Sequence, residues 1–80
     1  MSELRNNVRN EIAEIYESAL RVGYVNDDDI CDELHDWFDD VDDSNDAVLK
    51  QAYATACSAL EKENDVAKEL LKAALDLLAA

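Results

Sequence analysis

The chain has 80 residues, a formal net charge of −13 at pH 7 and a hydrophobic fraction of 49%. That fraction is too high for a disordered acidic tail, and the length fits one domain near the lower limit for a self-sufficient core. The chain has no Pro and one Gly, which are too few turn-forming residues for a β-rich fold. We therefore expect a single acidic all-α domain over residues 1–80, folded as a compact bundle of three to four amphipathic helices.

Nothing in the sequence indicates a membrane segment. No apolar run approaches the ~20 residues that span a bilayer, and the first residues, Met-Ser-Glu-Leu-Arg, lack the hydrophobic region of a signal peptide. The strong negative charge also disfavours contact with anionic lipid surfaces. We expect a cytoplasmic protein that makes no membrane contact.

The first predicted helix covers about residues 3–22, with Ser2 as its N-cap and Gly23 as its C-terminal stop. Its apolar residues recur every three or four positions, which is the period of a helix with one buried face. They are Leu4, Val8, Ile12, Ile15, Ala19 and Val22.

The second predicted helix starts after Asn26, a good N-cap, and ends near Asp40–Val41. Three Asp residues in its first turn are favoured there by the helix dipole. One face of this helix is apolar and is expected to be buried. It consists of Ile30, Leu34, Trp37, Phe38 and Val41.

Two further helices are predicted after this segment. Ser44 or Asn45 caps the first of them, whose slim apolar side is formed by Leu49, Ala52, Tyr53, Ala56 and Leu60. Asn64 with Asp65 resembles a fresh N-cap, so a separate last helix is expected from Asp65 to about Leu78. Together the four segments predict a core that includes Ile12, Ile15, Leu34, Trp37, Tyr53, Leu60, Leu70 and Leu77.

The last predicted helix has more apolar residues than one core-facing stripe needs. The surplus residues are Leu71, Leu75 and Leu78. Either this helix is central to the bundle, or the surplus leucines form the interface of a homodimer.

The residue types that usually carry metal or catalytic chemistry are sparse. Cys31 and Cys57 with His35 are too few ligands for a tetrahedral zinc site, and we expect both cysteines to be buried small apolar residues. A calcium-loop frame that starts at Asp42 fails, because Ala47 stands where Gly is required and Tyr53 where Glu is required. His35 sits at the edge of an apolar face, where packing is the usual role. We predict no catalytic, metal or cofactor site and no enzymatic activity.

The charge is concentrated in one segment. Residues 27–46 contain eleven acidic residues and no Lys or Arg, whereas the rest of the chain carries nine acids and seven bases. On a helical wheel the carboxylates of the second predicted helix lie opposite its apolar face as a continuous ridge, and Asp42, Asp43 and Asp46 extend the acidic patch past the end of that helix. As the partner-binding residues we predict Asp28, Asp29, Asp32, Glu33, Asp36, Asp39, Asp40, Asp42, Asp43 and Asp46. The alternatives are a solvated face that serves solubility, or adaptation to high salt, which would spread acids over all helices.

A rigid row of carboxylates can occupy a Lys/Arg-lined groove that normally holds nucleic-acid phosphates. In charge, size and helicity the chain resembles the small acidic inhibitors that phages make against host DNA-processing or CRISPR machinery. That resemblance implies a basic, nucleic-acid-binding partner protein in the host cytoplasm and no direct binding of nucleic acid. The alternative is a helical protein–protein interaction module, such as an adaptor or regulatory subunit, that binds through an apolar helix face.

Overall fold

The computed structural model describes residues 3–79, and all of its regular secondary structure is helical. The helices are α1 (Glu3–Val22), α2 (Asp27–His35), α3 (Phe38–Asp43), α4 (Ala47–Cys57) and α5 (Asn64–Ala79). The all-α prediction is confirmed, but the described residues form five helices where three to four were predicted. The radius of gyration of 11.5 Å matches the ~11.6 Å of a compact chain of this length.

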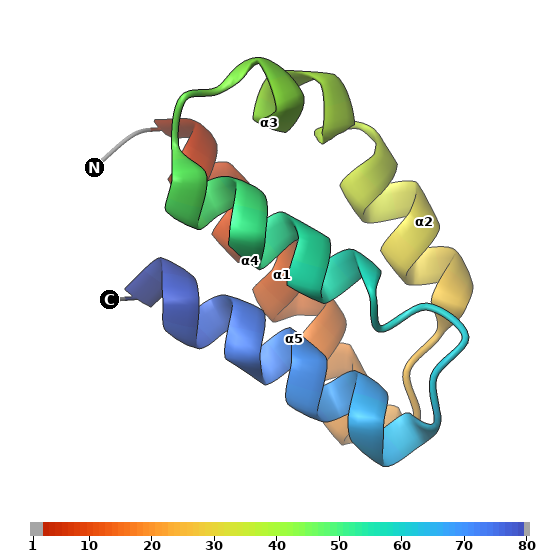
Figure 1. The fold of residues 1–80 in the computed structure, drawn as a ribbon. Coiled ribbons are helices and arrows are strands. Elements are labelled where there is room, and N and C mark those ends of the chain that lie inside the picture. The colour runs from red at the N-terminus through yellow and green to blue at the C-terminus, as the bar shows by residue number, and fades with distance from the viewer. Residues whose placement is uncertain (1–2, 80) are drawn as a thin grey trace.

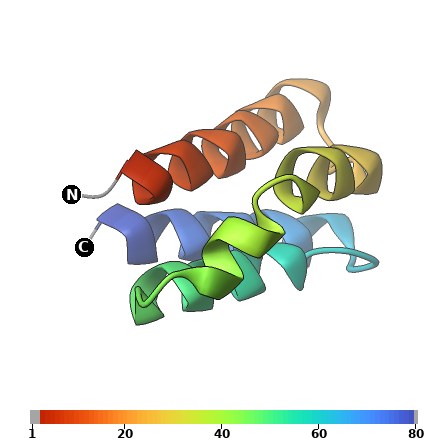
Figure 2. The same cartoon turned by 90° about the horizontal axis from the view of Figure 1, so that it is seen from above.

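The helices form a small bundle in which α5 contacts α1 and α4 (Figure 1). α4 and α5 run antiparallel, and the start of α1 and the end of α5 lie at the same end of the bundle. α2 and α3 together occupy the position opposite α5, where α2 contacts α1 and α4, and α3 contacts α4 (Figure 2). No described helix has the length and apolarity to cross a membrane.

The core is built from one buried stripe of each longer helix. Of the predicted core residues, Ile12, Ile15, Leu34 and Tyr53 are buried. The others are only partly buried and pack against the edge of the core: Trp37, Leu60, Leu70 and Leu77. In α5 the predicted face is rotated, because the buried stripe consists of Ala67, Leu71, Ala74 and Leu78.

This rotation overturns the proposed dimer surface. Leu71 and Leu78 have no exposed area, and Leu75 packs against the same core. The central position of α5 between α1 and α4 therefore accounts for Leu71 and Leu78, which are not available to a homodimer interface, while Leu75 is partly buried.

The second predicted helix is broken in two. α2 ends at His35, and Trp37 has φ −99° and ψ −2°, which is not a regular helical conformation. At this point the carbonyl oxygen of Leu34 accepts hydrogen bonds from the amide of Trp37 and from the buried hydroxyl of Tyr53. Since the chain changes direction here, Phe38 leaves the core and is 54% exposed, contrary to the prediction that it is buried.

The predicted helix ends are confirmed in part. Gly23 ends α1 with φ +89°, and the side chain of Asn26 caps α2 by accepting from the amide of Asp28. The cap of α4 is Asp46, where Ser44 or Asn45 was predicted. The Ser2 cap lies outside the described residues.

Asn64 has a different function from the predicted N-cap. The break before α5 is present, and Glu61 adopts φ +63° in it. However, the Asn64 side chain points to the connection between α1 and α2. Its Oδ1 accepts from the amide of Val25 at 2.7 Å, and its Nδ2 donates to the carbonyl of Gly23 at 2.6 Å. One amide group thus fastens the α1–α2 connection to the start of α5.

We expect Asn64→Ala to lower the free energy of unfolding by about 1–3 kcal/mol, because two backbone groups lose their hydrogen-bond partner at once. Chemical denaturation measures the change, and Asn45→Ala, at an exposed position, is the matched control. A destabilisation no larger than that of the control would contradict the role of Asn64.

Candidate functional site

The predicted partner-binding carboxylates lie on α2, on α3 and in the turns that flank α3. Asp29 and Asp46 are partly buried, and the others are exposed. Within the described residues only Asp46 has a Lys or Arg ion-pair partner. Nine of the ten predicted binding carboxylates therefore have no Lys or Arg ion-pair partner in the described part of the chain.

These carboxylates do not form the single ridge that was predicted for one continuous helix. Asp29 and Glu33 border a hollow against α1, where Glu14, Glu17 and Arg21 also lie. Asp40 and Asp43 border a second hollow beside Leu4 and the start of α1. Asp32 lines a groove on the other side of α2, toward α4. The acids of α2 occupy more than one side of that helix, and the break at Trp37 turns the acids of α3 in a further direction.

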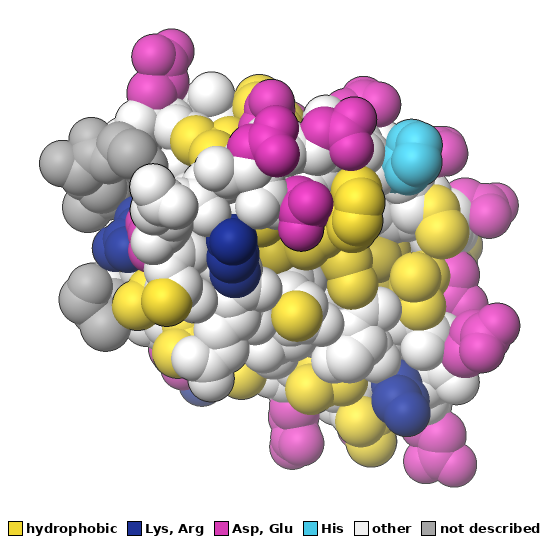
Figure 3. Space-filling model, turned by 45° about the horizontal axis from the view of Figure 1, so that its top comes forward, with side chains coloured by type: hydrophobic (Ala, Val, Ile, Leu, Met, Phe, Trp, Pro, Cys, Tyr) yellow, Lys and Arg dark blue, Asp and Glu magenta, His cyan; other side chains and the backbone are white. Residues whose placement is uncertain are grey.

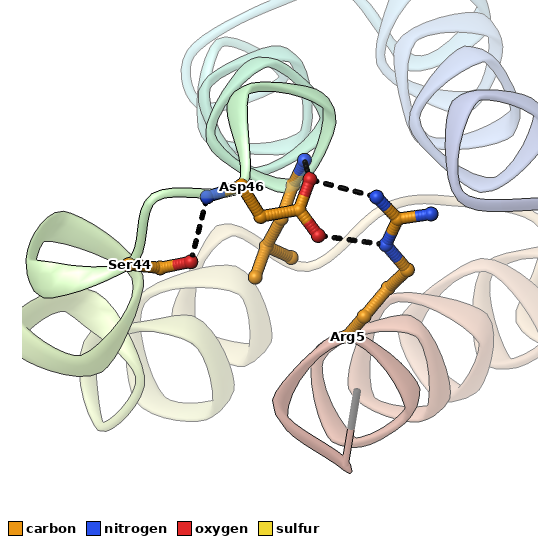
Figure 4. A network of polar contacts seen from close by, with 4 residues as sticks. Arg5, Ser44 and Asp46 are labelled. Atoms are coloured by element: carbon orange, nitrogen blue, oxygen red, sulfur yellow. Dashed lines mark hydrogen bonds and ion pairs between the residues drawn. The ribbon is translucent and has the colours of Figure 1, made fainter. Parts of the chain in front are cut away.

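Asp46 is a structural residue as well as an acidic one (Figure 4). Its carboxylate accepts from Arg5 Nε at 2.9 Å and from Arg5 Nη2 at 2.7 Å, and it caps α4 through the amide of Leu49. Its own amide donates to Ser44 Oγ. The Arg5 guanidinium, followed by the Leu49 amide, holds the pKa of Asp46 below its ordinary value. Asp46 joins α4 to α1 and is less available to a partner than the other acids.

A cluster of carboxylates joins α1 to α2. Carboxylate oxygens of Glu11, Glu14 and Glu33 lie within 4.8 Å of one another, and Glu11 Oε2 is buried without a hydrogen-bond donor. Since ionised carboxylates only accept hydrogen bonds, a proton on Glu11 is favoured, because the protonated group can donate to Glu33. This hydrogen bond, with burial and with the charges of Glu33, Glu14 and Asp36, raises the pKa of Glu11 to about 7.

An apolar groove of about 610 Å³ lies between α2, α3 and α4. Buried Leu34 and Tyr53 and half-exposed Phe38 are among its lining residues, and the Phe38 and Tyr53 ring centroids are 6.4 Å apart. The remaining lining residues are Ile30, Cys31, Asp32, His35, Ala54, Cys57 and Leu60. Figure 3 shows a hollowed apolar patch on this face, with acidic side chains along its upper and right edges and basic side chains at other borders.

The two cysteines lie in this groove and not in the core. Cys31 is exposed and Cys57 is partly buried, and both are free thiols, so the prediction of buried cysteines is wrong for Cys31. Burial raises the pKa of the Cys57 thiol.

Sequence reasoning missed both the groove and the Glu11 cluster. The groove depends on the helix break, which exposes Phe38. The apolar period of this segment is unbroken in the sequence, so it did not indicate the helix break. The Glu11 cluster combines α1 and α2, whereas the predicted site contained acidic residues between Asp28 and Asp46 and none of α1. A wheel comparison of the two helices would have placed Glu11, Glu14 and Glu33 on facing sides.

Folding stability is expected to fall as the pH rises through 7, owing to Glu11. Its pKa in the folded chain, about 7, is above its ordinary value of 4.5, so the native state binds this proton more tightly than the unfolded chain does. The resulting stabilisation is complete below pH ~4.5 and is lost as the pH passes 7. Glu11→Gln should flatten the profile between these values and raise stability at pH 8 by about 1 kcal/mol or less.

Thermal unfolding of wild type and Glu11→Gln across pH 4.5–8 checks this. Glu17→Gln, at an exposed position on the same helix, is the control and should leave the profile unchanged. Parallel pH profiles of stability for wild type and Glu11→Gln would contradict the assignment of a raised pKa to Glu11.

Moderate salt should stabilise the fold by about 1 kcal/mol between 10 mM and 150 mM NaCl, because screening relieves repulsion among the unneutralised acids of α2 and α3. The double variant Asp32→Asn/Asp36→Asn should show a smaller salt dependence than the control Asp65→Asn/Asp76→Asn on α5. Denaturant midpoints at the two salt concentrations measure this. A fall of wild-type stability over the range would mean that the acids are already compensated.

Comparison with known proteins finds no family model that matches the chain, and no curated protein or solved structure that matches it.

Proposed function

We propose that the protein is a small acidic inhibitor or regulator that binds the basic nucleic-acid-binding groove of a partner protein as a DNA or RNA mimic. A phage-encoded anti-defence protein, such as an anti-CRISPR inhibitor, is the leading concrete form of this proposal. Its role is binding and not catalysis. The observation that carries the proposal is the set of exposed carboxylates on α2 and α3 with no cationic partner in the described chain.

The spacing of these carboxylates supports mimicry. Asp28 and Asp32 are one helical turn apart, and Asp36 keeps helical dihedral angles (φ −62°, ψ −23°) although it follows the last residue of α2. Carboxylates four residues apart are separated by ~6 Å along a helix, and phosphates along one DNA strand recur every ~3.4 Å of axis. A Lys/Arg groove that tolerates variable phosphate positions can meet such a row.

Several contacts are required for useful affinity. A single exposed ion pair is worth ~0–1 kcal/mol, whereas each carboxylate offers two acceptor oxygens to a guanidinium or ammonium group. Acids on three sides of α2 and α3 fit insertion of this helix pair into a concave basic site better than contact with a flat one.

The apolar groove favours a second function, a protein–protein interaction module. Sequence reasoning placed the apolar binding face on the last helix, but Leu71 and Leu78 of that helix are buried. The groove beside Phe38 is a hollowed apolar surface that is open to a partner.

The quadruple variant Asp32→Asn/Asp36→Asn/Asp39→Asn/Asp40→Asn should abolish partner binding, since it removes four neighbouring exposed charges from the middle of the acidic segment and several contacts are needed for affinity. The fold should persist, because none of them lies in the core. The matched control removes four exposed acids elsewhere: Glu61→Gln, Asp65→Asn, Glu69→Gln and Asp76→Asn.

The measurement is capture of host proteins by immobilised wild type and both variants, followed by elution with duplex DNA, RNA or NaCl. We expect wild type and control to retain nucleic-acid-binding proteins that oligonucleotides displace, and the quadruple variant to retain none of them. Capture that survives the quadruple substitution and is indifferent to salt would refute mimicry.

A further inference from the structure

We infer that the apolar groove, together with the carboxylates along its α2 edge, is a docking site for an amphipathic helix of a partner protein that carries a Lys/Arg row beside an apolar row. The inference rests on the proposed function in one respect, namely that the acidic surface binds a cationic partner. What is new is that the partner also makes apolar contacts in the groove and that the bound segment is a helix.

Apolar and acidic surface lie side by side along α2. Asp32 lines the groove, and its neighbours one turn away on the same helix are Asp28 and Asp36. We name these three residues the α2 carboxylate row. On the groove side of this row Phe38 is exposed, and the buried side chains of Leu34 and Tyr53 line the groove beneath it. A ligand that enters the groove therefore lies beside the unneutralised Asp32 carboxylate, with Asp28 one turn before it and Asp36 one turn after it.

The two helices also match in period. The α2 carboxylate row extends ~12 Å at ~6 Å per step. Lys or Arg residues at positions i, i+4 and i+8 of another helix repeat with the same step. A partner helix that runs along the groove can therefore oppose Asp32 and, one turn away, Asp28, while its neighbouring i+3 and i+7 side chains turn toward the groove. Asp36, whose charge also acts on Glu11, adds to the negative field at the end of the row.

A second copy of this chain is a poor occupant of the groove. Each copy carries a net charge of −13, so groove-to-groove association would bring two α2 carboxylate rows together and is opposed by like-charge repulsion. A basic segment, in contrast, is attracted by the negative charge of the α2 carboxylate row. Charge complementarity thus selects a cationic helix from a different protein.

The test uses three synthetic peptides of about 18 residues with equal charge. The first has a Leu row beside a Lys row at helical spacing. The second has the same composition with the two rows on opposite faces, and the third has Gln in place of every Leu. Isothermal titration calorimetry measures their affinities for the intact protein. We expect the first to bind at least about tenfold more tightly than the other two.

Variants of the protein then locate the site. Ala54→Gln places a polar side chain in the groove at an exposed position of α4, and Ala73→Gln on α5 is its matched control outside the groove. Asp32→Asn is paired with Asp76→Asn in the same way. Ala54→Gln and Asp32→Asn should each weaken the first peptide about three- to tenfold, while the two controls leave its affinity unchanged. Alkylation of the exposed Cys31, which lines the groove, should slow when that peptide is bound.

Equal affinity of all three peptides, or equal effects of groove variants and controls, would overturn the inference and leave charge alone as the attraction. Unaltered Cys31 alkylation in the saturated complex would do the same. The outcome is separable from that of the proposed function. Partner capture that needs the acids but tolerates Ala54→Gln refutes docking in the groove and leaves mimicry intact, whereas the reverse pattern refutes mimicry.

Discussion

The hydrogen bond from the Tyr53 hydroxyl to the carbonyl oxygen of Leu34 is the contact on which much of this molecule depends. The last carbonyls of a helix need partners, and a buried hydroxyl needs an acceptor, so one contact meets both requirements. Burial raises the pKa of Tyr53 well above its ordinary value, which keeps the hydroxyl protonated as a donor. With α2 ended here, the chain turns at Trp37 and α3 lies over α4. The exposed position of Phe38, the groove and the spread of the acids all follow.

The acidic helices derive their stability from packing and not from their own sequence. α2 has nine residues and α3 has six, lengths at which an isolated helix is marginal in water, and Asp is a poor residue within a helix. Ile30, Leu34 and Val41 fix them to the core. A cationic partner that neutralises their carboxylates would remove repulsion and stabilise the folded state in proportion to its concentration. The least self-sufficient part of the fold is thus the part that a basic partner would stabilise most.

The sequence was sufficient to predict the fold class and three of the helices, because their apolar residues follow the helical period and Gly23 and Asn26 mark clear ends. The break at Trp37 was not predictable from local pattern, since Ile30, Leu34 and Val41 keep one period across it and the Tyr53 hydroxyl that bonds the Leu34 carbonyl there belongs to a different helix. The same holds for Asn64, whose partners lie about 40 positions earlier. The local pattern correctly predicted that the acidic residues are exposed, apart from Asp29 and Asp46. The direction in which each carboxylate points could be known only from the tertiary structure.

The Asn64 contacts also bear on the order in which the chain can acquire its structure during synthesis. The hydrogen bonds of Asn64 to Gly23 and Val25 span 41 and 39 residues, and the Arg5–Asp46 pair spans 41. Closing such long loops has an entropic cost that neighbouring contacts must offset, so these bonds form only after the C-terminal half has left the ribosome. Until then the α1–α2 connection lacks its two hydrogen bonds to the Asn64 side chain. Because the Val25 amide donates to Asn64, its hydrogen exchange reports directly on whether α5 has docked.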